Sequence, residues 1–169
     1  AMMLGTAGMT AGLAVLSIAD KLTLNKSKAV VSGATGGVGS IGVRLLSQLG
    51  ADVTAITGKM DKKSWLKELG ASKVLDRKRF IDSTNHPLNK GKYDIALDVV
   101  GGRILSSIIA SMNYGGIITT CGNVGGPKFE TSVFPFILRG NSLVGIDSAA
   151  CSIEKKKMMW ENFSSKWKL

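Results

Sequence analysis

The stretch VVSGATGGVG, Val30 to Gly39, joins the end of one apolar run to the start of another through four glycines in seven residues. The run Lys28 to Ser32 has the length and apolar content of a buried strand. The apolar residues after the glycines recur at helical spacing: Val38, Ile41, Leu45, Leu46 and Leu49. The stretch therefore predicts a strand, a tight turn and a helix in direct succession, with Gly50 ending the helix.

The same alternation continues along the rest of the chain. Further strands are predicted at Asp52 to Ile56, Lys73 to Leu75, Asp94 to Val99, Ile117 to Cys121 and Leu143 to Ile146. Helices are predicted at Thr10 to Leu22, after a cap at Asp61, along a face from Ile104 to Met112, and at Val133 to Gly140. The segment Arg77 to Lys92 is predicted as loop with a short helix. Strands separated by helices predict an α/β fold, a doubly wound, six-stranded parallel sheet of the Rossmann type.

Composition narrows the class of protein. With 169 residues, 44% hydrophobic and 20% charged, the chain has the size and composition of one globular domain. Its apolar runs are too short to cross a bilayer, and its start lacks the basic region of a signal peptide. Two cysteines suit a reducing compartment, and a single histidine, His86, argues against a zinc site. We therefore expect a cytoplasmic protein that contacts no membrane and holds no metal.

A net charge of +10 favours an anionic partner. Aromatic residues make up only 6% of the chain and do not interleave with the basic ones, which disfavours binding of single-stranded nucleic acid. The run Lys155 to Lys157 lies beside Met159, Trp160 and Phe163 in a pattern typical of an amphipathic helix with a basic face. We expect this face to be solvated and expect no nucleic-acid partner.

The glycine turn follows the first strand, where parallel α/β sheets bind their ligands. Gly36 has no side chain, so a pyrophosphate can approach the backbone, and Gly39 permits close packing of helix on strand. The helix behind the turn directs free N–H groups and a positive dipole end at such an anion. This arrangement predicts a dinucleotide site.

Two glycine motifs fit the turn. Ala34 to Gly39 reads as A-x-G-x-x-G, while Ser32 to Gly39 reads as [ST]-G-x-x-x-G-x-G. The second form suggests a short-chain dehydrogenase, but neither Tyr93 nor Tyr114 is followed by lysine four residues later. A phosphate loop of the Gly-Lys-[Ser/Thr] type is also absent from the sequence.

The second strand indicates which dinucleotide is bound. An NAD site usually carries an acidic residue about 20 residues beyond the glycine turn. Here Thr57, Gly58 and Lys59 follow the strand instead, and Lys73 adds a cation at the start of the third strand. A hydroxyl, a small residue and a cation suit a 2′-phosphate, so the sequence predicts NADP(H).

A set of ordered motifs resembles one known family. The motifs are GTAGMTAG (5–12), GATGGVGS (33–40), TGK (57–59), LGASKVLDR (69–77), LDVVGG (97–102), YGGIITTCGNVGG (114–126) and FPFILRGNSLVGIDS (134–148). Together they resemble the zinc-independent quinone oxidoreductase branch of the medium-chain dehydrogenases and reductases, of the acryloyl-CoA reductase type.

The resemblance implies cofactor contacts position by position. The pyrophosphate turn corresponds to Thr35, Gly36, Gly37 and Val38, the 2′-phosphate loop to Thr57, Gly58 and Lys59, and a basic position near the adenosine to Lys73. Asn123 corresponds to a position beside the nicotinamide ribose, and Ile137 and Ser148 to further cofactor contacts. For Ile137, a core position in a short helix is an equally open reading.

Members of the family have roughly twice this length. The resemblance therefore implies an inter-domain helix and lead-in segment (1–27), an NADP-binding domain (28–150) and a C-terminal amphipathic helix (151–169), without the GroES-like catalytic domain. The implied activity is hydride transfer from NADPH to an activated C=C bond of a small-molecule substrate, in an assembly that can be a homodimer. No catalytic residue is assigned, and Cys121 is expected to be a packed thiol. A non-enzymatic dinucleotide-binding or sensor module is the alternative.

Overall fold

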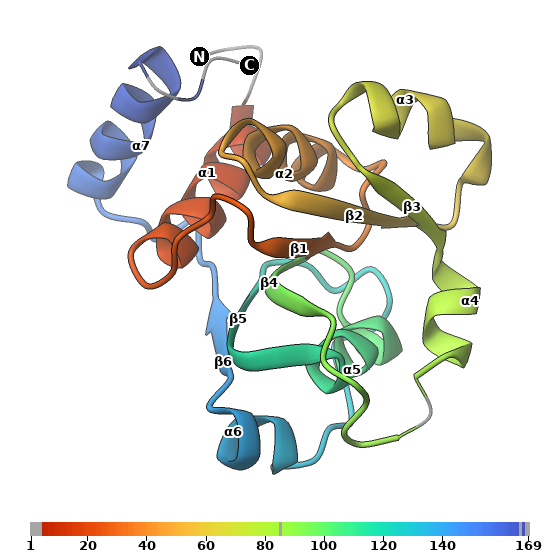
Figure 1. Ribbon diagram of the computed structural model, residues 1–169. Coiled ribbons are helices and arrows are strands. Elements are labelled where there is room, and N and C mark those ends of the chain that lie inside the picture. The colour runs from red at the N-terminus through yellow and green to blue at the C-terminus, as the bar shows by residue number, and fades with distance from the viewer. Residues whose placement is uncertain (1–4, 85, 166, 168–169) are drawn as a thin grey trace.

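The computed structural model describes residues 5–84, 86–165 and 167, and Figure 1 shows their arrangement. The lead-in segment and the C-terminal stretch predicted from the sequence extend in part into residues 1–4, 166 and 168–169, which lie outside this description. The helices are α1 (Gly5–Ala19), α2 (Gly37–Gln48), α3 (Lys63–Glu68), α4 (Arg77–Asp82), α5 (Gly102–Ala110), α6 (Phe134–Arg139) and α7 (Ile153–Ser165), with a 3-10 turn η1 (Met60–Lys62). The strands are β1 (Lys28–Val31), β2 (Asp52–Thr57), β3 (Lys73–Asp76), β4 (Tyr93–Asp98), β5 (Met112–Thr120) and β6 (Ser142–Gly145).

The described strands form one parallel sheet in the order β3-β2-β1-β4-β5-β6. Strand β1 pairs with β2 on one side and with β4 on the other, so the strand order reverses between β1 and β4. The predicted doubly wound parallel fold is confirmed. In such sheets the crevice for a ligand opens at the carboxyl ends of the two strands that flank this reversal.

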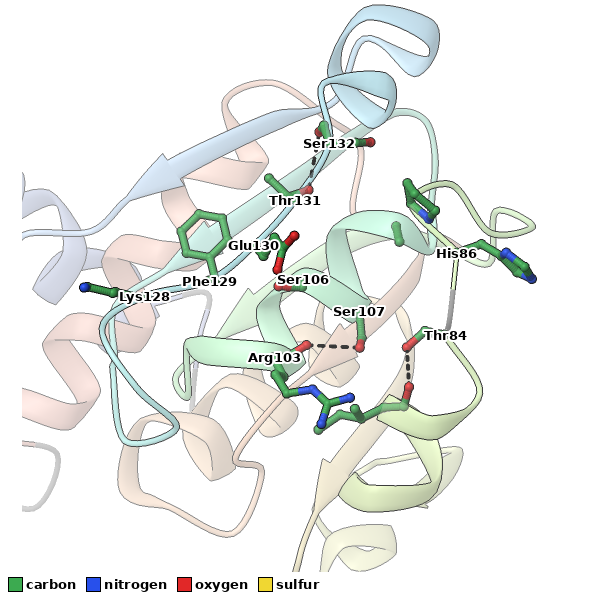
Figure 2. Close-up of a pocket in the computed structure, with 13 residues that line it drawn as sticks. Thr84, His86, Arg103, Ser106, Ser107, Lys128, Phe129, Glu130, Thr131 and Ser132 are labelled. Carbon is green, nitrogen blue, oxygen red and sulfur yellow. Dashed lines mark hydrogen bonds between the residues drawn. The ribbon is translucent and has the colours of Figure 1, made fainter.

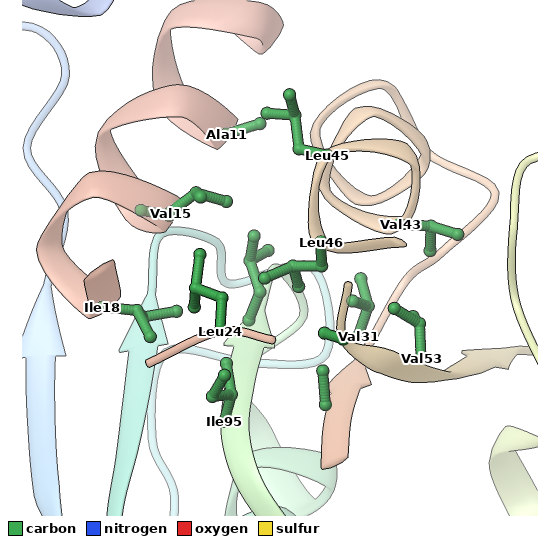
Figure 3. Packing of buried hydrophobic residues seen from close by; sticks show 14 of the residues in the cluster. Ala11, Val15, Ile18, Leu24, Val31, Val43, Leu45, Leu46, Val53 and Ile95 are labelled. Atoms are coloured by element: carbon green, nitrogen blue, oxygen red, sulfur yellow. The ribbon is translucent and has the colours of Figure 1, made fainter. Parts of the chain in front are cut away.

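Buried side chains cover both faces of the sheet. Ala29 and Val31 of β1 belong to a core cluster with α1, α2 and α7, whereas Val30 between them belongs to a second cluster with α5. Alternate strand residues face opposite sides, so each strand must be apolar on both. Figure 3 shows the first cluster, with Leu45 of α2 beside Ala11 of α1 and Leu46 of α2 directed toward the strands.

The short helix predicted between Arg77 and Lys92 is α4. Other details differ from the prediction: helix α1 spans Gly5–Ala19 rather than Thr10 to Leu22. Asp61 caps no helix: it lies inside η1, and α3 begins behind Lys62 without a side-chain cap. Helix α5 ends at Ala110, and Met112 starts β5. Met112 is fully buried in the same cluster as α5, which explains why it matched the helical face.

The C-terminal helix has the predicted amphipathic character. Met159 on α7 is fully buried against α1, and Trp160 and Phe163 pack partly buried beside it. Lys155 and Lys157 are exposed. Among the described residues, no helix is both long and apolar enough to cross a membrane.

Candidate functional site

The glycine turn holds its shape through backbone contacts. Gly33 has a φ of +56°, and a Cβ there would lie 2.5 Å from a methyl carbon of Val99. The N–H of Gly36 donates to the carbonyl oxygen of Gly33 at 2.9 Å. Gly36 is the N-cap of α2, and its lack of a side chain leaves the cap without a side-chain hydrogen bond. The first-turn N–H groups of α2 therefore face outward without an intrahelical acceptor.

Thr35 ties the turn to the end of β2. Its hydroxyl lies 3.1 Å from the hydroxyl of Thr57, the last residue of β2. Gly36 and Gly37 are exposed, while Val38 is half-buried against the first core cluster. Thr35 thus ties the turn, which holds four of the predicted residues, to the strand end that carries Thr57.

The loop after β2 brings a cation to the same place. Thr57 is 1% exposed, and its hydroxyl oxygen accepts a hydrogen bond from the N–H of Lys59 at 3.0 Å. Gly58 and Lys59 are exposed. A Cβ on Gly58 would lie 3.3 Å from a terminal guanidinium nitrogen of Arg77, so the Arg77 side chain covers this glycine. Lys59, which follows Gly58, and Arg77, which packs on Gly58, therefore place two cationic residues at one short loop beyond the carboxyl end of β2.

The sequence predicts Lys73 as the basic contact near the adenosine and does not indicate Arg77. Thr57 pairs in register with Asp76, whereas Lys73 pairs with Thr54, three residues before the end of β2. The structure therefore does not bring Lys73 to the loop that holds Lys59. Arg77 directly follows β3, and the rule that ligands bind at the carboxyl ends of parallel strands could have pointed to it.

A hollow of about 570 Å³ lies at the carboxyl ends of β5 and β6. Its walls are formed by Thr120, Cys121, Gly122, Asn123, Gly145, Ile146 and Asp147. Asn123 is thus placed in this hollow, and Ser148 directly follows it, accepting a hydrogen bond from the Thr10 hydroxyl at 2.9 Å. Ile137 lies on α6 with 69% of its surface exposed, and it is not among the residues of this hollow.

Cys121 in this hollow is a poor nucleophile. Burial raises the pKa of its thiol to about 11, and the negative charge of Asp98 contributes in the same direction. The reactive form of cysteine is the thiolate, so a raised pKa keeps the group unreactive near neutral pH.

A larger cavity of about 680 Å³ lies away from the glycine turn, over the outer side of α5 (Figure 2). Its lining comes from the end of α4 and the loop after it, from α5 and from the segment 128–132, including Arg103, Ser107 and Phe129. None of the residues predicted for the cofactor contributes to it. Size alone therefore does not identify the ligand site in this fold.

The sequence profile of the family described as zinc-binding dehydrogenase matches residues 37–165, which begin in the first turn of α2 and run through α7. The chain belongs to the zinc-binding dehydrogenase family. Its matched part is the cofactor domain of the medium-chain dehydrogenases and reductases, which confirms the family resemblance seen in the sequence.

Individual members of the family are closely similar to this chain. The acrylyl-CoA reductase AcuI of Ruegeria pomeroyi is 36% identical over 165 residues, 97% of this chain and 50% of that protein. The crystal structure of Bacillus subtilis YhfP with NAD bound matches with a TM-score of 0.95 and 43% identity, covering 99% of this chain and 51% of that one. The Escherichia coli K-12 YhdH structure with bound NADPH matches with a TM-score of 0.93 and 40% identity, covering 98% and 51%.

The chain thus spans about half the length of these zinc-binding dehydrogenase relatives. The solved relatives hold NAD in one case and NADPH in the other. Despite the family's name, no three His, Cys, Asp or Glu side chains within residues 5–84, 86–165 and 167 come close enough together to hold a metal ion. The described part of the chain therefore offers no set of ligands that fits a zinc ion.

Proposed function

We propose that this chain binds NADP(H) and forms the cofactor half of an oxidoreductase that reduces an activated C=C bond. The observation that carries the proposal is the pair of cations, Lys59 and Arg77, around Gly58 at the end of β2. A 2′-phosphate distinguishes NADP(H) from NAD(H), and a cationic loop next to the glycine turn is where the adenosine ribose of a dinucleotide lies in this fold. The family relationship supports the fold of this site but leaves the choice of coenzyme open.

Each part of the coenzyme has a matching group. The first-turn N–H groups of α2, at Gly37 and Val38, suit the pyrophosphate. The guanidinium of Arg77 can grip a phosphate with two parallel hydrogen bonds, and Lys59 adds a mobile point charge. The hollow that contains Asn123 suits the nicotinamide end, with Ile137 and Ser148 as further contacts inferred from the family resemblance.

When bound, the coenzyme would supply the hydride, and this chain would bind and orient it. Burial raises the pKa of the Cys121 thiol to about 11, so we give this residue no nucleophilic role. The AcuI relative is an acrylyl-CoA reductase, which supports an acryloyl thioester or an enone as the acceptor. We assign no catalytic acid to this chain.

Calorimetric titration of the chain with NADPH and NADH tests the proposal. We expect NADPH to bind more tightly, and Lys59→Ala or Arg77→Ala each to weaken NADPH binding about tenfold, because each removes a charge-assisted contact. The affinity for NADH should change less than about twofold in both variants, because the deleted contacts involve the 2′-phosphate alone.

Lys73→Ala is the matched control, because the sequence predicts a cofactor contact for Lys73 but this residue lies away from the Lys59 loop. It should leave both affinities within about twofold of the original values. Equal affinities for NADPH and NADH in the unsubstituted chain would contradict the choice of NADP(H). No binding of either coenzyme would contradict the proposed function as a whole.

A further inference from the structure

Asp98 is a fully buried carboxylate at the carboxyl end of β4. One of its oxygens accepts the hydroxyl of Ser32 at 2.6 Å and the N–H of Val100 at 3.2 Å. The other accepts the N–H of Gly101 and the hydroxyl of Thr120, each at 3.0 Å. A buried charge is tolerated only when it is well hydrogen-bonded, and four donors meet this demand.

The donors come from both sides of the point where the strand order reverses. Ser32 directly follows β1 and precedes the glycine turn, and its hydroxyl oxygen also accepts the N–H of Val99 at 3.0 Å. Thr120 ends β5 and lines the hollow that contains Asn123. The carboxylate thus links the ends of β1, β4 and β5 directly beneath the crevice.

A dinucleotide must contact both sides at once. Its adenosine and phosphates would lie against the turn and the Lys59 loop, and its nicotinamide would lie in the hollow at β5 and β6. When one ligand joins two half-sites, its affinity depends on whether their separation fits the ligand, because the second contact is intramolecular. Preorganised half-sites avoid the cost of ordering them during binding.

We propose that Asp98 is a positioning residue, which holds the two half-sites for the dinucleotide at the separation that the ligand needs. This inference rests on the proposed function and adds to it a residue that touches no part of the coenzyme. The proposal predicts that loss of the Asp98 carboxylate weakens binding of the whole dinucleotide more than it weakens binding of a ligand that occupies only the adenosine half.

Asp98→Asn is the informative substitution. It preserves the size of the side chain but replaces one acceptor oxygen by an NH2 group, which faces a main-chain N–H of Val100 or Gly101. That N–H then loses its acceptor, and the strand end must shift. The adenosine half-site keeps its own contacts, including the Thr35 to Thr57 link.

Asp94 offers a matched control on the same strand. One of its oxygens accepts the N–H of Lys28 at the start of β1, and the other accepts the Asn113 side chain of β5 at 2.7 Å. Asp94 therefore bridges the same strands as Asp98, but at the opposite end of β4. A purely structural role in holding the strands together would be shared by both residues.

The test measures the affinity of the 169-residue chain for NADPH and for adenosine 2′,5′-bisphosphate, which represents the adenosine half alone. For Asp98→Asn we expect NADPH affinity to fall about tenfold, because the preorganisation of the half-sites is lost. Adenosine 2′,5′-bisphosphate should bind within about twofold of its original affinity, and Asp94→Asn should leave both ligands within the same limit.

Three results would overturn the inference: an equal loss for both ligands, an unchanged NADPH affinity in Asp98→Asn, or the same pattern in Asp94→Asn. If Asp98→Asn does not fold, Ser32→Ala removes one donor to Asp98 at a residue outside the hollow, and it should weaken NADPH about threefold while adenosine 2′,5′-bisphosphate stays within about twofold. If the unsubstituted chain binds both ligands and any of these results is found, only the role of Asp98 is rejected. If the unsubstituted chain binds neither ligand, the proposed function fails and this inference fails with it.

Discussion

Gly36 and Gly39 lie three residues apart in the same turn, yet the structure places different demands on them. A Cβ on Gly39 would lie 2.3 Å from the carbonyl oxygen of Gly33, a main-chain atom that cannot move away cheaply. A Cβ on Gly36 would lie 3.3 Å from the same oxygen, and Gly36 has φ −83° and ψ 169°, which any residue can adopt. Gly39 is needed for packing, whereas Gly36 leaves its outer side open.

This contrast predicts separable effects on stability and binding. Gly39→Ala should lower the free energy of unfolding by about 1–3 kcal/mol, because the added carbon overpacks the turn. Gly36→Val should change it by less than about 1 kcal/mol. Gly36→Val should nevertheless abolish NADPH binding, because the added side chain would fill the place that we propose for the pyrophosphate. Urea unfolding and calorimetry measure the two effects, and retained binding in Gly36→Val would mean that the turn is purely structural.

At the scale of elements, α7 is held on α1 at a glycine. A Cβ on Gly12 would lie 2.8 Å from the Cγ of Met159 and 2.9 Å from the ring of Phe163, so the absence of a side chain lets the two helices approach. Phe163 in turn packs edge-on against Trp167, with ring centroids 5.6 Å apart. The C-terminal helix is thus an integral part of the core on this face of the sheet.

Adjacent methionines of α7 provide a direct test. Met159 is fully buried and Met158 is 53% exposed. Met159→Ala should lower the free energy of unfolding by about 2–5 kcal/mol, because it leaves a cavity between α7 and α1. Met158→Ala should change it by less than about 0.5 kcal/mol. Thermal or urea unfolding gives both values, and equal effects of the two substitutions would contradict this packing.

Elements with strong periodicity were predictable from the sequence, and their boundaries were less so. The β1, turn and α2 unit was predicted because its signals are local: an apolar strand, glycines and a 3.6-residue period. The predicted end of α5 was wrong because Met112, the first residue of β5, is buried in the same cluster as the α5 residues and so continues their apolar pattern. Asp61 was wrong as a cap because a 3-10 turn precedes α3, and propensity alone does not reveal such a turn.

At the scale of the whole molecule, the proposed site exists only when the sheet is formed. The turn after β1, the loop after β2 and the hollow at β5 and β6 are far apart in the chain, and parallel pairing brings their ends to one edge. A ligand that needs all three can bind only the folded chain, so binding must stabilise the fold.

The expected stabilisation can be measured. NADPH at 100 times its dissociation constant should raise the free energy of unfolding by about 2.7 kcal/mol. NADH at the same concentration should raise it by less, because it lacks the phosphate that Lys59 and Arg77 suit. Thermal unfolding with each coenzyme checks this expectation, with Gly36→Val as the control that shows no shift. An identical shift in Gly36→Val would place the binding elsewhere.

The fold class, the order of strands and helices near the glycine turn, and the loop at Thr57 to Lys59 were predictable from the sequence, because each depends on neighbours along the chain. The position of Arg77 beside that loop, in place of Lys73, and the hydrogen bonds that Asp98 accepts from the ends of β1 and β5 became visible only in the folded chain. These positions depend on how neighbouring strands pair. Lys73 and Arg77 lie at opposite ends of β3, and the pairing of β3 with β2 sets which of them lies level with the end of β2.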